Sequence, residues 1–361
     1  MATVNEFKTE TPSLTAVNDF FLERPAYKEG YDQETNTVIR LVSSKRNKPG
    51  KEKKAYKVTG IDDVAAKNNW KAWLYLAPAL ILVVIFLIYP LINTIFISFL
   101  KDYSYVTGSF SGMTFENFGI ILGLTPYNGV YETNFVKYAI PNTFIIVFLT
   151  VPISTLIALM ISVWLNSIKW FQKFLQIVFF LPYVTNAIAV GMVFSVLFDE
   201  HGIINYMFNS NIVWIYAATR EHAMVPLMLY IVWSSLPFKI LIFLSGLQGI
   251  DKQYYQAAKV DAASSTKILW RITVPLMSPQ IMYIVITSFI GAFKEYTAIV
   301  GLFNNPGTTP GDYSLYTIVY YIYDNLNSHT TFAAAAAVFL FIIILVFTFI
   351  QLGVSKKRVH Y

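Results

Sequence analysis

Residues 72–99 read AWLYLAPALILVVIFLIYPLINTIFISF and contain no Asp, Glu, Lys or Arg. An α-helix needs about 20 predominantly apolar residues to cross the hydrocarbon core of a bilayer, so this stretch predicts a membrane-spanning helix. Five later stretches share its length and apolar character, at 138–166, 174–198, 223–250, 272–303 and 332–354. The sequence therefore predicts an all-α membrane protein with six transmembrane helices. The shorter apolar stretch 313–323 is expected at a membrane interface.

The composition of the chain excludes a soluble enzyme. Of the 361 residues 55% are hydrophobic and only 13% are charged, whereas a soluble globular protein carries roughly 25% charged residues. Residues 1–71 hold 23 of the 48 charged residues. We therefore expect a cytoplasmic, largely disordered polar tail at 1–71, a transmembrane domain at 72–354 and a cytoplasmic end at 355–361. The basic run 43–57 favours either contact with anionic membrane lipid or a solvated linker.

The positive charges indicate the orientation of the spans, because cytoplasmic loops retain Lys and Arg. Of the 27 Lys and Arg residues, 22 lie in the tail, the 166–174 turn, the 251–271 loop and the C-terminal end. The loops on the other side hold only Lys101, Lys137 and Arg220. Both termini are therefore expected in the cytoplasm, and the net charge of +6 reflects topology rather than a nucleic-acid partner.

The sequence lacks the usual marks of a catalytic or metal site. It has no cysteine, and its four histidines share no ligand spacing, so no cofactor or metal is expected. It also has no G-x-x-x-x-G-K-[ST] phosphate loop. The chain is therefore expected not to be an enzyme, and the sequence shows no means of hydrolysing ATP itself.

The cytoplasmic loop at 251–275 is unusual because part of it is rich in alanine. Residues 254–263 read YYQAAKVDAA, and residues 267–275 read KILWRITVP. Short side chains favour a helix and permit the close approach of another protein. Tyr254, Tyr255, Ala258 and Ala262 fall at helical spacing and form a stripe that fits a groove on a partner. An amphipathic helix on the membrane surface is the alternative.

This loop resembles the EAA loop of ABC-importer permeases, in which Glu-Ala-Ala is followed at fixed intervals by Gly, Ile and Leu-Pro. The matching positions are Gln256-Ala257-Ala258, Ala262, Ile272 and Val274-Pro275. Gln, Ala and Val stand here in place of the usual Glu, Gly and Leu. Further matches are Leu181-Pro182-Tyr183, Leu247-Gln248-Gly249-Ile250 and Pro306-Gly307. Together they resemble the maltose-type family of carbohydrate-importer permeases, which has a MetI-like fold.

The resemblance implies a transmembrane subunit of an ATP-driven importer that carries a sugar or oligosaccharide across the bacterial plasma (inner) membrane. The implied partners are a second homologous permease subunit, two cytoplasmic ATPase subunits and an extracellular or periplasmic solute-binding protein. The loop at 251–275 would form a coupling helix that is seated in a cleft of the ATPase. The residues assigned to that contact are Tyr255, Gln256, Ala257, Ala258, Asp261, Ala262 and Ala263.

Ionisable residues inside predicted spans are rare and are candidates for function. The six runs contain only Lys239, Lys294 and Glu295. Ser288, Gly291, Ala292 and Glu295 share one helical face at offsets 0, 3, 4 and 7. That face combines a hydroxyl, two small residues and a carboxylate, as a cavity for a sugar requires.

The resemblance implies that this face contacts the sugar, and it adds Ser235 and Phe238 around Pro237 in the preceding span. The alternative for Glu295 is a structural ion pair with Lys239 or with the second permease subunit. The serines fit a helix-packing role equally well, and lysines within spans can snorkel to the interface.

Four tyrosines after the fifth run, Tyr313, Tyr316, Tyr320 and Tyr323, recur at offsets 0, 3, 7 and 10. They predict an aromatic stripe that either anchors at the interface or stacks on a sugar at the outer gate. For the whole chain, one alternative is a permease for another solute, such as a glycerol phosphodiester or a peptide. An ATP-independent secondary transporter is less favoured, because no inverted internal repeat with paired broken helices is evident.

Overall fold

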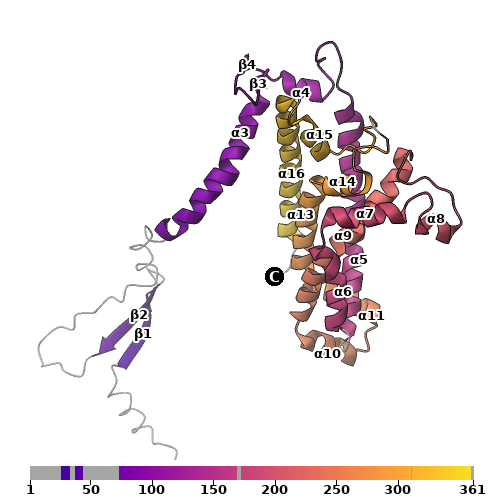
Figure 1. Cartoon of the computed structure of the whole chain (residues 1–361). Coiled ribbons are helices and arrows are strands. Elements are labelled where there is room, and N and C mark those ends of the chain that lie inside the picture. The colour runs from indigo at the N-terminus through magenta and orange to yellow at the C-terminus, as the bar shows by residue number, and fades with distance from the viewer. Residues whose placement is uncertain (1–25, 33–36, 44–72, 169–171, 310, 359–361) are drawn as a thin grey trace, which may run out of the picture. The chain divides into compact units, whose positions relative to one another are not determined.

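The computed structural model describes residues 26–32, 37–43, 73–168, 172–309 and 311–358 (Figure 1). The chain divides into two units, 1–89 and 90–361. In the first unit, strand β1 (Ala26–Asp32) pairs antiparallel with β2 (Thr37–Ser43), with Ala26 opposite Ser43. Most of the predicted disordered tail, including nearly all of the basic run 43–57, lies outside the described residues.

Four helices of the described chain are long and apolar enough to cross a membrane, and they lie within three residues of predicted runs. They are Trp73–Ser98, Phe135–Ser167, Arg220–Gln248 and Thr330–Ser355. The first includes η1 (Val84–Ile88) and α3 (Tyr89–Ser98), and the second consists of η2 (Phe135–Ala139) and α5 (Ile140–Ser167). The third is α9 (Arg220–Gln248), and the fourth belongs to α16 (Thr330–Arg358).

The third predicted run, 174–198, is not one continuous helix. It forms α6 (Gln172–Val184) and α7 (Ala187–Leu197). Asn186 caps α7, because its side-chain oxygen accepts hydrogen bonds from the amides of Ile188 at 2.9 Å and Ala189 at 3.3 Å. A side chain that satisfies the first amides of a new helix favours a break at that point, so the expectation of a single span here is not met.

The fifth predicted run, 272–303, is bent and then interrupted. Its first part is built from α11 (Ser265–Ile268), η3 (Leu269–Thr273) and α12 (Val274–Leu276), and it meets α13 (Ser278–Phe293) at 69°. Pro275 and Pro279 flank the bend, and each removes an amide donor and disfavours helical backbone before it. The chain leaves α13 at Lys294 and restarts as α14 (Thr297–Phe303). With the bent pair counted as one, the described residues hold five candidate spans rather than the predicted six.

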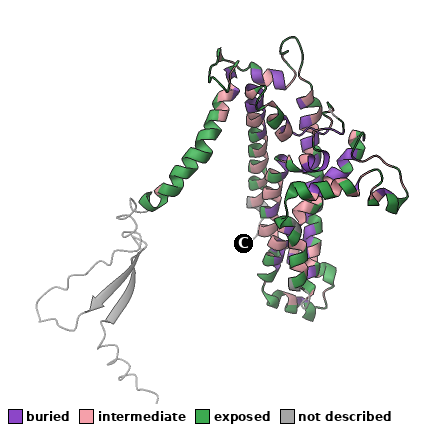
Figure 2. Ribbon diagram, in the orientation of Figure 1, coloured by how far each residue is buried: buried purple, intermediate pink, exposed green. Residues whose placement is uncertain are grey.

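The second unit is a helical bundle in which α5 packs along α9 and α13, and α16 packs against α13 and α15 (Ile318–Asn325). Its largest fully buried side chains include Ile146, Leu227, Phe243 and Phe293, and Figure 2 shows such buried residues gathered along α5 and α9. α7 packs against α14 so closely that a Cβ on Gly191 would lie 2.7 Å from Cα of Gly301.

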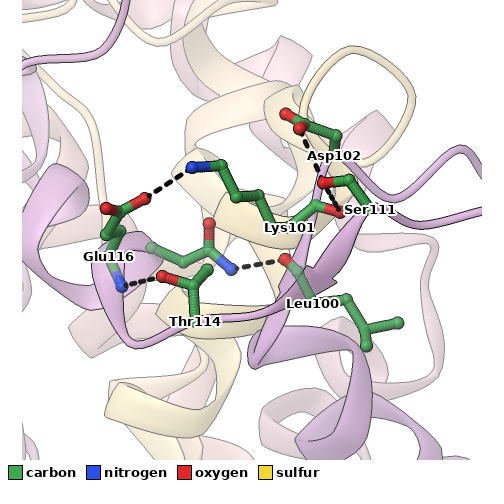
Figure 3. Close-up of polar contacts among 7 residues, drawn as sticks. Leu100, Lys101, Asp102, Ser111, Thr114 and Glu116 are labelled. Atoms are coloured by element: carbon green, nitrogen blue, oxygen red, sulfur yellow. Dashed lines mark hydrogen bonds and ion pairs between the residues drawn. The ribbon is translucent and has the colours of Figure 1, made fainter.

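The two ends of this bundle carry different elements (Figure 1). α10 (Lys252–Val260) lies at one end, and α4 (Glu116–Ile121) and α15 lie at the other. Near α4, β3 (Leu100–Lys101) pairs antiparallel with β4 (Gly112–Met113), and α8 (Ile203–Phe208) follows α7. Figure 3 shows how polar contacts hold this end: Lys101 forms an ion pair with Glu116 at 3.3 Å, and the hydroxyl of Ser111 donates to Asp102 at 2.8 Å.

Candidate functional site

A cavity of about 290 Å³ is lined by residues of α5, α9 and α13. All six residues predicted to contact substrate line it: Ser235, Phe238, Ser288, Gly291, Ala292 and Glu295. The remaining lining residues are Thr150, Val151, Ser154, Ile231, Ser234, Lys239 and Thr287. The face predicted from helical spacing at 288–295 and the two residues predicted on the preceding span, Ser235 and Phe238, therefore line the same cavity in the folded chain.

Most hydroxyl groups of this cavity donate a hydrogen bond to a carbonyl of their own helix. The hydroxyl of Ser235 donates to the carbonyl of Val232 at 2.9 Å, and that of Thr150 donates to the carbonyl of Ile146 at 2.7 Å. Since a hydroxyl has one proton and two lone pairs, these groups offer acceptors to a ligand. Gly291 adds room, because a Cβ at that position would meet no atom within 4 Å. The cavity is thus suited to a ligand that is rich in hydroxyl donors.

Two charged residues line the cavity without pairing. Lys239 is only 3% exposed, and its ammonium donates to the hydroxyl of Ser154. Glu295 lies in the break between α13 and α14, where its Oε1 accepts a hydrogen bond from the amide of Ala298 at 2.9 Å. Lys101–Glu116 is the one side-chain salt bridge within the described part of the chain. The intramolecular Lys239–Glu295 ion pair that the sequence left open is therefore not formed.

A second cavity of about 310 Å³ shares Ser234 and Glu295 with the first. It adds three aromatic residues, Tyr183, Tyr230 and Trp233, and the exposed Lys294. The sequence placed Tyr183 in a family-like segment but assigned none of these aromatic rings to a site. Tyr183 lies on α6 just before the break at Asn186, and no periodicity in the sequence signalled that break. Among the residues that the structure describes, no group of three or more His, Cys, Asp or Glu side chains is placed to hold a metal.

The predicted coupling segment forms the short helix α10 and a tight turn. Asp251 caps the helix by accepting a hydrogen bond from the amide of Gln253 at 2.9 Å. At the other end the amide of Ala262 donates to the carbonyl of Lys259 at 3.1 Å, and Ala262 has a φ of +50°. This is a Schellman C-cap, in which glycine is the usual residue at the left-handed position. Alanine therefore holds a backbone conformation at residue 262 that an L side chain disfavours.

The residues predicted to contact an ATPase lie on different faces of α10. Ala258 is buried against its own chain with 5% exposure, and the half-buried Tyr255 has its hydroxyl 3.3 Å from that of Thr273. The exposed ones are Gln256, Ala257, Asp261 and Ala262, and Ala263 is half-buried. The stripe through Tyr255 and Ala258 thus packs against its own subunit. The exposed outer face of α10 passes through Gln256, Ala257 and Val260.

The four tyrosines at 313–323 do not lie on one helix, because α15 begins only at Ile318. Tyr313 and Tyr316 stack on each other before that helix, with ring centroids 5.0 Å apart, and Tyr316 also donates to Asp324. Tyr320 and Tyr323 both contact the ring of Tyr296, at 5.2 Å and 4.8 Å. The rings of Tyr316 and Tyr320 also meet edge to face at 5.6 Å, so the four tyrosines are linked by ring contacts but do not form a stripe along one helix.

The segment between α14 and α15 is held by two polar centres. Asp312 accepts hydrogen bonds from the amide (2.9 Å) and hydroxyl (2.7 Å) of Ser314 and from the amide of Thr308 (3.2 Å). Burial raises the pKa of Asp312, but these hydrogen bonds prevail and hold it below the usual value of 3.8. The fully buried Asn142 donates to the carbonyls of Ser314 (2.8 Å) and Tyr316 (2.7 Å) and accepts from Arg220. Asn142 thereby ties this segment to α5 and α9.

Known proteins resemble the chain in sequence and in fold. It is 28% identical over 276 residues to the arabinooligosaccharides transport system permease protein AraP of Bacillus subtilis. This alignment covers 74% of this chain and 82% of AraP. It is 25% identical over 296 residues to the lactose transport system permease protein LacF of Rhizobium radiobacter, covering 79% and 94% of the two chains. A crystal structure of a bacterial ABC transporter involved in the import of the acidic polysaccharide alginate superposes with a TM-score of 0.66 at 21% identity, covering 82% of this chain and 99% of that one.

The family itself is recognised by a sequence model that matches residues 154–360, more than half of the chain. That model describes the inner membrane component of binding-protein-dependent transport systems. The matched region includes α9, α10, α13 and most of the cavity lining. The resemblance drawn from the loop at 251–275 is thus confirmed, as is the expectation of a permease subunit rather than an enzyme. The chain is a multi-pass membrane protein and belongs to the family of inner membrane components of binding-protein-dependent transport systems.

Proposed function

We propose that this chain is a transmembrane subunit of an ATP-driven importer that moves a sugar or oligosaccharide into the cell. The observation that carries the proposal is the convergence of Ser235, Phe238, Ser288, Gly291, Ala292 and Glu295 on one cavity between three helices. The hydroxyl acceptors there match the donors that a sugar presents. The names of the relatives AraP and LacF, which refer to arabino-oligosaccharides and lactose, support the same class of substrate.

In this proposal the outer face of α10 contacts a cytoplasmic ATPase subunit. The face combines a short exposed side chain at Ala257 with polar groups at Gln256 and Asp261, so another protein can approach the helix closely. A second homologous permease completes the pathway, two ATPase subunits drive it, and a solute-binding protein delivers the ligand at the opposite end of the bundle. Both termini then lie in the cytoplasm, as the distribution of Lys and Arg indicates.

The test is transport by the complete complex in proteoliposomes, with radiolabelled saccharides and with or without ATP. Glu295→Ala is expected to abolish or retune saccharide uptake while the complex still assembles, because the carboxylate lines the cavity. Glu221→Ala, which changes an exposed glutamate in the first turn of α9, is the matched control and is expected to transport normally. Unchanged saccharide kinetics in Glu295→Ala would refute the site, and uptake without ATP would favour a secondary transporter.

A further inference from the structure

Lys239 is a buried cation that has no carboxylate partner in the part of the chain that the structure describes. It is 3% exposed on α9, in the middle of a helix that is long enough to span the membrane. An ammonium has three protons to donate, and the hydroxyl of Ser154 receives one of them. Within the described residues, no carboxylate oxygen lies within 4.0 Å of Lys239.

The surroundings of Lys239 supply little negative charge. The residues of α5 and α13 that line the same cavity, including Thr150, Ser154, Thr287 and Ser288, are uncharged. Glu295 is the only acidic residue in the lining, and one of its oxygens is engaged with the amide of Ala298. A buried cation without a counter-charge is strongly unfavourable, so an anion from outside the described residues would stabilise Lys239.

We propose that the cavity binds an anionic sugar or polyol, with a carboxylate or phosphate of the ligand against Lys239 and its hydroxyl groups against Glu295 and the serine oxygens. The inference rests on the proposed function and narrows its substrate class. The cavity of about 290 Å³ is at the small end of the range of ligand pockets, roughly 300–1,000 Å³, so it accommodates a small ligand or one end of a longer chain. Lys239 then acts as the residue that selects for charge.

The experiment compares matched ligands in the complete transporter, reconstituted with one and the same solute-binding protein. The probes are digalacturonate against galactobiose, which tests a carboxylate, and sn-glycerol 3-phosphate against glycerol, which tests a phosphate. Wild type is expected to take up one anionic probe at least about tenfold faster than its neutral partner, as one charge-assisted hydrogen bond allows. Lys239→Gln is expected to bring this ratio close to one, whereas Lys239→Arg retains it. Lys137→Gln changes an exposed lysine and serves as the control.

Each result separates the inference from the proposed function. If the neutral saccharide is taken up with ATP at least as fast as its anionic partner, or if the ratio of the two rates is unchanged in Lys239→Gln, the inference of an anionic ligand is wrong. The proposal of a sugar importer then still stands. Uptake of sn-glycerol 3-phosphate alone supports the anionic site and overturns the sugar. Uptake of no probe overturns both. If Lys239→Gln no longer co-purifies with the second permease while Lys239→Arg does, the counter-charge lies in that subunit and the inference is wrong.

Discussion

The amide of Ala263 donates a hydrogen bond to the carbonyl of Ala258 at 2.9 Å and closes the C-terminus of α10. Between them, Ala262 has a φ of +50°. Side chains with a Cβ cost roughly 1–2 kcal/mol in this left-handed conformation, and glycine avoids the cost. The segment proposed to contact the ATPase therefore ends in a strained turn.

Ala262→Gly is expected to stabilise this turn by about 1 kcal/mol. Hydrogen–deuterium exchange of the amides of α10 in the purified complex should slow on the order of fivefold, since 1 kcal/mol changes an opening equilibrium by about that factor. Ala257→Gly is the matched control, because it places glycine inside the same helix and is expected to speed exchange. Equal effects of the two changes would contradict the role of the left-handed position.

Ala257→Arg is expected to abolish ATP-driven uptake without disturbing the chain's own packing. Ala257 is exposed on α10, so a long cation there blocks the close approach of an ATPase subunit. Ala258→Arg is a weaker test, because Ala258 is buried with 5% exposure and the change also disrupts the loop itself. Uptake assays and co-purification of the ATPase check the prediction, and normal values for both in Ala257→Arg would remove this face from the contact.

The helical periodicity of residues 288–295 was enough to predict that Ser288 and Glu295 share a cavity, because most of that face lies on the regular part of α13. It did not predict that α13 ends at Phe293, since hydropathy reports the composition of a run and not its continuity. For the same reason the apolar run 174–198 concealed the break before Asn186. Breaks of this kind come from single side chains that cap helices, such as Asn186 and Glu295.

The sequence could not predict that Ala258 is buried against its own chain. A helical stripe shows which residues share a face, but not whether that face meets its own subunit or a partner. Here the tertiary contact between Tyr255 and Thr273 decides the question. The EAA-like spacing predicts which segment couples to an ATPase, and the packing of the folded chain shows which face of that segment is exposed.

Gly191→Ala is expected to destabilise the packing of α7 against α14 by about 1–3 kcal/mol. A Cβ at residue 191 would lie 2.7 Å from the Cα of Gly301, which is closer than packed carbon atoms approach each other. The apparent melting temperature of the purified complex should fall. Gly353→Ala on α16 is the control, because a Cβ there meets no atom within 4 Å. The melting temperature of this control should be unchanged or higher. An equal fall in melting temperature for both variants would contradict the close packing of α7 against α14 at Gly191.

The contribution of Asp312 to stability is expected to depend on pH. Its pKa is lower in the folded chain than the usual 3.8, so its stabilisation is present above that value and is lost as the pH falls through the folded pKa. The difference in melting temperature between wild type and Asp312→Asn should therefore shrink below about pH 4. Ser314→Ala removes the hydrogen bond from the serine hydroxyl to the carboxylate. At pH 7 its melting temperature is expected to lie between those of wild type and Asp312→Asn. A difference that stays constant down to pH 2 would contradict the assignment.

Asn142→Leu is expected to loosen the segment that precedes α15. Asn142 is fully buried, and its amide group satisfies the carbonyls of Ser314 and Tyr316 while its oxygen accepts from Arg220. Leucine leaves all three partners without this side chain, and the carbonyl of Tyr316, which is the one in buried surroundings, loses a hydrogen bond that water does not replace. One unsatisfied buried group costs about 1–3 kcal/mol, so the free energy of unfolding should fall by about that amount. Asn142→Asp keeps the oxygen that accepts from Arg220, so its free energy of unfolding is expected to fall less than that of Asn142→Leu. Asn211→Leu, at an exposed position, is the control for the substitution itself. If Asn142→Leu lowers the free energy of unfolding no more than Asn211→Leu does, the hydrogen bonds of Asn142 do not stabilise the bundle.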